Sequence, residues 1–101
     1  MEDVAMDELQ KKAQYVAQLL SVLSNENRLR ILCELLERPM TVGELAEAVP
    51  NISAPALSQH LNKLRSVSFV ASEKQGQYLR YSITDERLYG LMAYLKQEFC
   101  D

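Results

Sequence analysis

The chain has 101 residues, of which 48% are hydrophobic and 25% charged, and it contains three glycines, three prolines and two cysteines. This length predicts a single domain over residues 1–101, and the composition excludes a disordered, collagen-like or low-complexity protein. No apolar run approaches the roughly 20 residues that span a bilayer, and the acidic start of the chain is unlike a signal peptide. We therefore expect a cytoplasmic protein with no membrane partner.

Periodic apolar residues predict two helices in the first third of the chain. Over residues 7–23 they recur at steps of three and four, which indicates one amphipathic helix. The break at 24–25 contains a capping residue, and a second leucine-rich helix follows it. This helix is expected to end near Arg38, because Pro39 disfavours a helical residue before it.

Capping residues then mark two further helices. Thr41 and Glu44 have the spacing of a capping box, which predicts a short third helix that stops at Pro50. Ser53 is a good N-cap for a fourth helix, and Pro55 is tolerated in its first turn. The apolar side of the fourth helix carries Leu57, Leu61 and Leu64.

After this helix the period changes to that of strands. Residues 69–74 and 78–83 predict a hairpin around a turn at 75–77, and a last helix begins at 84–86 and ends at Cys100. The residues of the second strand that are expected to face the core are Leu79, Tyr81 and Ile83. The last helix has an apolar stripe of Leu88, Leu91, Met92, Leu95 and Phe99. The predicted order is α-α-α-α-β-β-α.

The charge is unevenly distributed along the chain. The formal net charge is −3, which by itself argues against a nucleic-acid partner. Residues 53–80, however, hold four basic side chains and one acidic one, so this segment carries +3 and the remainder −6. A basic segment on an acidic body directs DNA to one face of the molecule.

The predicted order, with two short helices, a tight turn and a basic hairpin, is that of a winged helix-turn-helix. Ser58 and Gln59 on the fourth helix are suited to hydrogen-bond base edges in a major groove. The side chains suited to phosphate contacts are Lys63, Arg65, Lys74 and Arg80. The alternative is an ordinary amphipathic helix with a solvated polar face.

Three motifs together resemble the ArsR/SmtB family of bacterial repressors. They are residues 25–32, residues 58–65 and the wing from Lys74 to Ile83, and the likeness extends from about Val16 to the end. The resemblance implies a mainly α fold with a β-hairpin wing, and a homodimer whose first and last helices form the interface. It implies a palindromic operator, no enzymatic activity and no cofactor. It places Ser58 and Gln59 at base-contacting positions. Together with the basic side chains and the wing, the predicted DNA-binding residues are Ser58, Gln59, His60, Lys63, Arg65, Lys74, Gln75, Gly76, Gln77 and Arg80.

The metal sites of the family lack their ligands in this chain. The thiol-rich site needs a Cys-x-Cys pair where this chain has residues 44–47, and the zinc or nickel site needs histidines that the last helix does not contain. The single histidine, His60, lies in the fourth helix, where packing or a phosphate contact is the expected role. We therefore expect no metal.

Cys33 and Cys100 are free thiols, a redox pair or ligands, because a reducing cytosol disfavours a permanent disulfide. Their placement resembles the sulfide- and persulfide-responsive subgroup called BigR-, SqrR-, YgaV- or HlyU-like. The resemblance implies that a reactive sulfur species persulfidates one thiolate and that the other closes an intrasubunit disulfide or polysulfide bridge. The repressor would then leave its operator.

Several alternatives remain open from the sequence. The cysteines could be buried and inert in a constitutive regulator, or the repressor could respond to a metal or to general redox stress such as peroxide or nitric oxide. A thiol oxidoreductase and a pure protein-interaction module are the rivals from other classes. The chain has no Cys-x-x-Cys motif to support the oxidoreductase.

Overall fold

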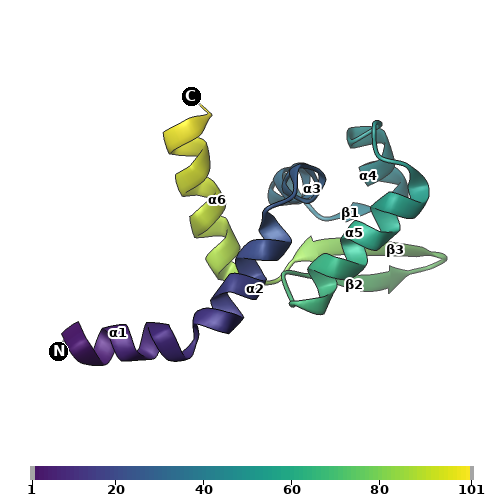
Figure 1. The fold of residues 1–101 in the computed structure, drawn as a ribbon. Helices are drawn as coiled ribbons and strands as arrows, with labels where there is room; N and C mark the ends of the chain where they lie inside the picture. Colours follow the sequence, from purple (N-terminus) through teal and green to yellow (C-terminus); the bar gives the residue numbers. More distant parts are fainter. Residues whose placement is uncertain (1, 101) are drawn as a thin grey trace.

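The computed structural model describes residues 2–100, with side chains from residue 7 onwards. This part of the chain forms six helices and three strands (Figure 1). The helices are α1 (Glu2–Lys11), α2 (Ala13–Leu23), α3 (Glu26–Glu37), α4 (Val42–Ala48), α5 (Ala54–Ser66) and α6 (Glu86–Phe99). The strands are β1 (Met40–Thr41), β2 (Val70–Gln75) and β3 (Tyr78–Ile83). The predicted winged helix-turn-helix fold, mainly helical with a hairpin wing, is confirmed.

The three strands form one antiparallel sheet in the order β1-β3-β2. In the hairpin, Val70 pairs with Ile83 at one end and Gln75 with Tyr78 at the other, which leaves a two-residue loop. Gly76 is the first residue of this loop and has a φ of 62°, a conformation that side chains with a Cβ rarely adopt.

The core lies between α3, α4, α5 and the sheet. Its fully buried side chains are mostly leucines, because leucine fits well in a helix and removes a large apolar surface from water. Those with almost no exposed surface include Ile31, Leu32, Leu45, Leu57, Leu61 and Leu64. Tyr81 and Ile83 of β3 close the core from the sheet side.

A tight reversal after α5 leads the chain into the hairpin. Ser68 has a φ of 63°, its N–H donates to the carbonyl of Arg65 at 3.0 Å, and the N–H of Phe69 donates to that of Leu64 at 3.1 Å. This is the Schellman pattern of helix termination, in which glycine is the usual left-handed residue. Phe69 and Leu64 are both buried, which supplies the apolar contact that accompanies the motif.

The structure differs from the prediction in three places. The helix predicted over residues 7–23 is divided at Lys12, whose ψ of 6° is not helical, because periodicity continues through a bend and does not reveal it. β1 was not predicted, since two residues carry no period of their own. Leu79 was expected to face the core but is 43% exposed, because the end of the hairpin extends beyond the helices.

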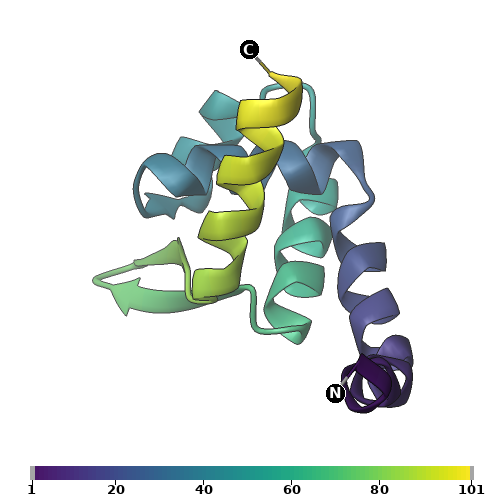
Figure 2. The ribbon, with the colours of Figure 1, turned by 90° about the vertical axis from the view of Figure 1, so that its left-hand side faces the viewer.

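The outer helices give the molecule an open shape of 51 × 31 × 21 Å. In Figure 1 α1 points away from the rest of the molecule, and α6 stands beside α3 at the opposite side from the wing. Figure 2 shows α6 in front of α3, while α1 is seen nearly end-on below α2. The helix-turn-helix and the wing therefore lie on one side, and α1 and α6 on the other.

Candidate DNA interface and cysteine groove

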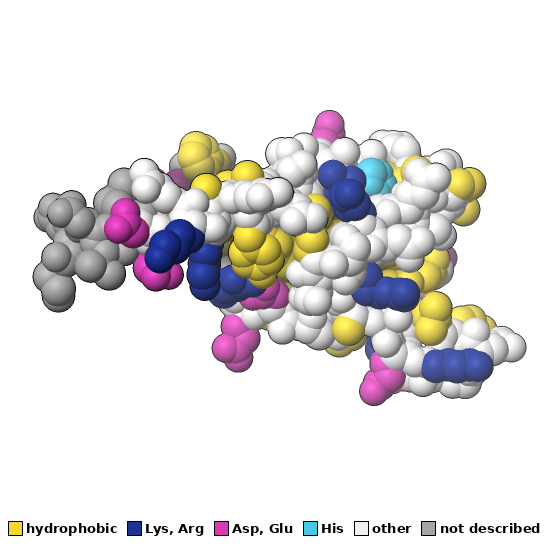
Figure 3. Space-filling view, turned by 60° about the horizontal axis from the view of Figure 1, so that its bottom comes forward, with side chains coloured by type: hydrophobic (Ala, Val, Ile, Leu, Met, Phe, Trp, Pro, Cys, Tyr) yellow, Lys and Arg dark blue, Asp and Glu magenta, His cyan; other side chains and the backbone are white. Residues whose placement is uncertain are grey.

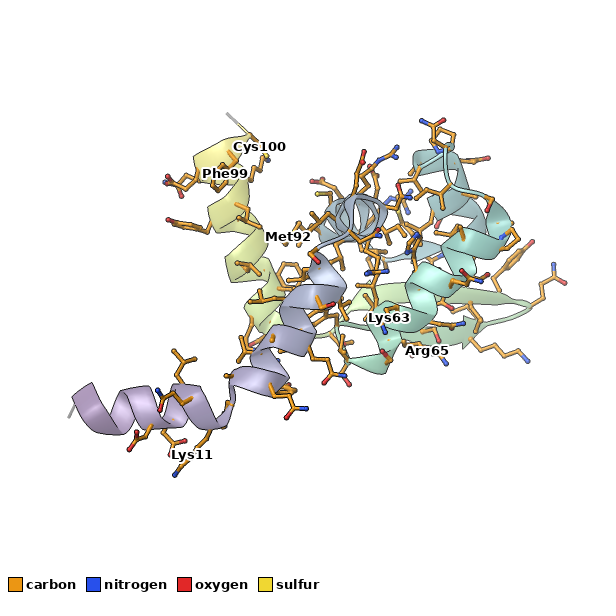
Figure 4. The ribbon with its side chains drawn as sticks, viewed as in Figure 1. Lys11, Lys63, Arg65, Met92, Phe99 and Cys100 are labelled. Carbon is orange, nitrogen blue, oxygen red and sulfur yellow. The ribbon has the colours of Figure 1, made fainter. Side chains whose placement is uncertain are left out.

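Helix α5 presents the polar side chains that the sequence assigned to DNA. The Ser53 hydroxyl accepts from the N–H of Ala56 at 3.2 Å and so fixes the start of the helix. The leucines of α5 face the core, which leaves Ser58, Gln59 and Lys63 exposed on the opposite side. Figure 4 labels Lys63 and Arg65 in the second half of this helix. The arrangement places hydroxyl, amide and ammonium groups on one exposed face of α5, where they can hydrogen-bond to a single binding partner.

The preceding helix α4 is fixed by the predicted capping box. The Thr41 N–H donates to Glu44 at 2.9 Å, and the Thr41 hydroxyl accepts from the N–H of Glu44 at 3.2 Å. These contacts, led by the backbone bond from Thr41, lower the pKa of Glu44, which also pairs with Arg38 at 3.4 Å. The start of α4, directly after β1, is therefore fixed by local hydrogen bonds.

The wing tip projects four exposed residues from the sheet. Lys74, Gln75, Gly76 and Gln77 all lie at this end of the hairpin, and Gln77 donates to the Tyr78 hydroxyl at 3.2 Å. Figure 3 shows basic side chains spaced over the face that includes α5 and the hairpin. The helix and the wing tip are thus the two exposed polar regions on this side.

Two of the basic residues that were assigned to phosphates have partners within the protein. Arg65 donates to the Ser72 hydroxyl at 3.3 Å, which joins α5 to β2. Arg80 is half-buried, donates to Gln75 at 2.8 Å and to the Pro39 carbonyl at 3.3 Å, and also lies 3.9 Å from Glu44. Arg80 therefore links the wing to β1 and α4, whereas Lys63 and Lys74 extend into solvent.

His60 is half-buried at the boundary between α5 and α3. Its Nδ1 lies 3.3 Å from Nη1 of Arg28, and the Nε of Arg28 donates to the Val22 carbonyl at 2.6 Å. Burial, and secondarily the charge of Arg28, lowers the pKa of His60. Arg28 had no role in the sequence interpretation, because nothing in its spacing indicates a partner 32 residues away.

Cys33 and Cys100 line one groove between α3 and α6. The groove has a volume of about 580 Å³, and both cysteines are free and exposed. Its walls are mainly apolar and come from Leu29 and Leu36 of α3 and Tyr89, Met92, Ala93 and Leu95 of α6, with Glu37 and Lys96 as its charged members. Figure 4 labels Cys100 at the end of α6 and Met92 on the side of that helix that faces α3.

Within this groove the thiol of Cys33 is a weaker acid than an ordinary cysteine thiol. Burial raises the pKa of its thiol most, and the negative charges of Cys100 and Glu34 raise it further, whereas Lys96 lowers it. Lys96 was missed at the sequence level, although its position one turn before Cys100 on the last helix was a usable signal.

Two kinds of site are absent from the described residues. Among residues 7–100, whose side chains the structure describes, no three His, Cys, Asp or Glu side chains come together as a metal site would require. No helix in this part of the chain is long and apolar enough to cross a membrane.

Known proteins similar to this chain agree with the geometry. Residues 25–72 match the model for bacterial regulatory proteins of the arsR family. The HTH-type transcriptional regulator YgaV of Escherichia coli is 38% identical over 94 residues, which are 92% of this chain and 94% of that protein. The transcriptional activator HlyU of Vibrio cholerae is 34% identical, over 94% of this chain and 87% of that protein.

Solved structures extend the likeness to three dimensions. The transcriptional repressor BigR from Xylella fastidiosa superimposes with a TM-score of 0.85 and 33% identity, over 95% of this chain and 97% of that one. Reduced HlyU from Vibrio cholerae gives a TM-score of 0.84 and 34% identity, over 93% and 98%. The chain therefore belongs to the ArsR family of bacterial regulatory proteins, and it is a DNA-binding transcriptional repressor of that family rather than an enzyme.

Proposed function

We propose that this repressor acts in the cytoplasm as a homodimer on a palindromic operator and is released when reactive sulfur species join Cys33 to Cys100 within one subunit. The observation that carries the proposal is the groove, since two free thiols from different helices line the same cavity of about 580 Å³. A relative from Vibrio cholerae has been solved as reduced HlyU, which supports thiol redox chemistry in a protein with this fold.

The exposed face of α5 is the part of the protein that would read the operator. Ser58 and Gln59 are exposed and lie one turn before Lys63, so amide and hydroxyl groups meet base edges while the ammonium group meets a phosphate. The other contacts in this proposal are Arg65, Lys74, Gln75, Gly76, Gln77 and Arg80. His60 is left out of these contacts, because it is half-buried and its ring lies against Arg28. Arg65 and Arg80 would have to share their guanidinium groups with their internal partners.

Exposed apolar side chains support a second copy of the chain as partner. Among the described side chains, nine large hydrophobic residues are exposed, and two of them lie on the wing. The other seven, on α1, α2 and α6, are Leu9, Tyr15, Leu20, Tyr89, Leu91, Tyr94 and Phe99. Exposed large apolar side chains gathered on the helices that flank the molecule are typical of a protein interface. Closed twofold symmetry then suits a palindromic operator.

The sulfur chemistry of the proposal needs only the two thiols and a persulfide RSSH. A cysteine thiolate attacks the outer sulfur of RSSH, which forms a cysteine persulfide and releases the thiol RSH. The second cysteine then attacks the inner sulfur of this persulfide, which closes a disulfide and releases H₂S. A second RSSH would first lengthen the persulfide by one sulfur, to Cys–S–S–SH, with release of RSH. Attack of the second cysteine on the middle sulfur would then close a trisulfide and release H₂S.

A bridge of either length would change the relation between two helices. Cys33 lies on α3, which packs against the recognition helix α5, and Cys100 caps the end of α6. The bridge therefore holds the dimer helix and the helix-turn-helix in one fixed arrangement. In this proposal the reduced dimer binds the operator and the bridged dimer does not. The bridge therefore acts as an inducer does in a two-state repressor.

The test is release from DNA by a persulfide donor, measured by fluorescence anisotropy on the chain's own upstream region. The wild type is expected to leave the operator after treatment and to rebind after reduction with a dithiol. Cys33→Ser and Cys100→Ser are expected to bind as the reduced wild type does and to remain bound, since each lacks half of the bridge. Mass spectrometry identifies the disulfide or trisulfide product.

Two results would contradict this switch. One is a Cys100→Ser protein that the persulfide donor still releases from DNA. The other is stoichiometric release of the wild type by zinc, cadmium or arsenite, which would make the protein a metal sensor. Peroxide and nitric oxide donors serve as comparisons, because they oxidise thiols without supplying sulfur.

The DNA face is tested by separating sequence-specific from general affinity. Gln59→Ala is expected to weaken operator binding by about 1–3 kcal/mol with little effect on unrelated DNA, as the loss of a bidentate base contact would. Lys74→Ala is expected to weaken both and to reduce the salt dependence by about one unit of slope. Lys12→Ala is the matched control, an exposed lysine outside residues 53–80. Unchanged binding by Gln59→Ala and Lys74→Ala would remove α5 and the wing from the interface.

A further inference from the structure

We propose that Arg28 and His60 form the mechanical link by which the state of the cysteine groove reaches the recognition helix. The proposal rests on the cysteine switch described above and assigns its coupling element. In it, His60 is a positioning residue whose ring is held from inside the protein, so its importance does not come from a contact with DNA.

A single arginine side chain connects three helices. The Nε of Arg28, on α3, donates to the Val22 carbonyl near the end of α2 at 2.6 Å. Its Nη1 lies 3.3 Å from Nδ1 of His60 on α5, and its own backbone N–H donates to the Asn25 cap at 3.0 Å. A guanidinium group held at both ends is a stiff connection, because its donors are fixed in one plane.

The chemistry of the two groups defines the direction of this hydrogen bond. A guanidinium group has donors only, so Nδ1 of His60 accepts and its proton resides on Nε2. Burial, and secondarily the neighbouring positive charge, lowers the pKa of His60, which favours the neutral ring that this hydrogen bond requires. His60 is the residue that directly follows Gln59, so the orientation of its ring is coupled to the exposed face of α5.

The position of Arg28 on α3 brings it into the same rigid segment as the switch. Cys33 follows Arg28 by five residues, which is about 7.5 Å along a helix. A bridge from Cys33 to Cys100 acts on α3 from the side of α6, and the helix carries Arg28 with it. The leucine contacts between α3 and α5 tolerate small sliding movements, whereas a hydrogen bond weakens steeply when its angle changes.

Alternative roles for this contact predict different measurements. If His60 were a phosphate contact, its loss would weaken operator binding equally in the reduced and bridged proteins. If the contact only stabilised the fold, its loss would lower the melting temperature and leave the response to sulfur unchanged. If it couples the two sites, the response itself becomes smaller.

The quantity to measure is the release ratio, which is the operator Kd of the bridged protein divided by that of the reduced protein. His60→Leu and Arg28→Met are each expected to lower this ratio by about tenfold, while the Kd of the reduced protein changes by less than about threefold. The double variant is expected to match the single variants, because one contact is lost in all three. His60→Asn keeps an acceptor near the position of Nδ1 and is expected to preserve the ratio.

Arg30→Met is the matched control, since Arg30 lies on the same helix and its contact with Asn27 at 3.5 Å stays within α3. Melting temperatures of all variants identify any that fail to fold. A release ratio unchanged in His60→Leu and Arg28→Met overturns the link, as does a ratio lowered equally by Arg30→Met. A wild type that is not released at all refutes the cysteine switch itself, and this outcome is read from the wild type alone.

Discussion

The winged helix-turn-helix from α3 to β3 and the outer helices α1, α2 and α6 differ in how completely they bury their apolar residues. In the first region the leucines of α3, α4 and α5 have almost no exposed surface. In the second, Leu20 is 54% exposed, Tyr94 59% and Phe99 78%. The core of the winged helix-turn-helix is therefore closed within one chain, whereas the outer helices leave large apolar side chains exposed.

This difference in burial suits the two regions to different roles. A region with a closed core keeps its shape when its surroundings change, so it suits the reading of a fixed DNA sequence. A region with much of its apolar surface exposed, and therefore few buried contacts of its own, opens and shifts at a lower free-energy cost. The cysteine groove lies where the two regions meet, with one wall from α3 and the other from α6.

Charged substitutions on the outer helices are the strongest test of this difference between the two regions. Leu20→Asp combined with Leu91→Asp is expected to produce monomers that retain the helical content of the wild type, because neither residue is in the core. Operator affinity is expected to fall by about 10²–10⁴-fold, since binding at one half-site no longer brings the second into reach. Analytical ultracentrifugation and anisotropy measure the two effects.

The matched control for this pair is Leu79→Asp, an exposed leucine on the wing that is 43% exposed. It is expected to remain dimeric. A double variant that stays dimeric at micromolar concentration would show that the outer helices do not form the interface.

Truncation of a core leucine tests the other side of the comparison. In the monomeric double variant, Leu61→Ala is expected to lower the free energy of unfolding by about 2–5 kcal/mol, because Leu61 is 1% exposed and its removal leaves a cavity. Tyr94→Ala in the same background is expected to change it by less than about 0.5 kcal/mol. Urea unfolding followed by circular dichroism measures both values, and equal losses would refute the distinction between the regions.

Local signals made most of the closed region predictable. The caps Thr41 and Ser53 lie where the sequence placed them, and Asn25 and Asp85 lie within the predicted segments 24–25 and 84–86. Each is found locally because the cap side chain accepts from a backbone N–H only two or three residues away. The spacing of the leucines identified the buried side of each helix for the same reason. The hairpin was found from its change of period.

Contacts between distant residues were not predictable from a single sequence. The pairing of β1 with β3 and the contact of Arg28 with His60 join residues that are far apart in the chain. The groove shares this origin, since Cys33 and Cys100 are brought together only by the packing of α6 on α3. The exposure of several apolar residues on the last helix was likewise not predictable. An apolar stripe predicts burial, but it does not indicate which element or partner covers it.

A smaller effect is expected at the turn that leads from α5 into the wing. Ser68→Gly is expected to raise the free energy of unfolding by roughly 0.5–1 kcal/mol, because Ser68 has a φ of 63° and glycine adopts this conformation without strain. Ser66→Gly, at the last residue of α5, is the control and is expected to lower stability, because the Ser66 hydroxyl donates to the Lys63 carbonyl at 2.6 Å. Destabilisation by Ser68→Gly would mean that its side chain contributes more than the backbone strain removes.

The smallest expected effect concerns the charges around the groove where the two regions meet. Burial raises the pKa of Cys33, so at neutral pH it is mainly the unreactive thiol, and its rate of alkylation is expected to rise as pH increases. Lys96 opposes this shift and Glu34 adds to it. Lys96→Met is therefore expected to move the pH–rate profile of Cys33 to higher pH, and Glu34→Gln to lower pH. Since both side chains reach solvent, each change in rate at pH 7.5 is expected to be about two- to fivefold, the equivalent of ~0.5–1 kcal/mol.

The rates are measured with iodoacetamide in the Cys100→Ser background, where the Cys100 charge no longer contributes. Lys63→Met, far from the groove on α5, is expected to leave the profile in place. A shift of the same sign for Lys96→Met and Glu34→Gln would show that packing of the groove, and not its charge, controls the reactivity of Cys33.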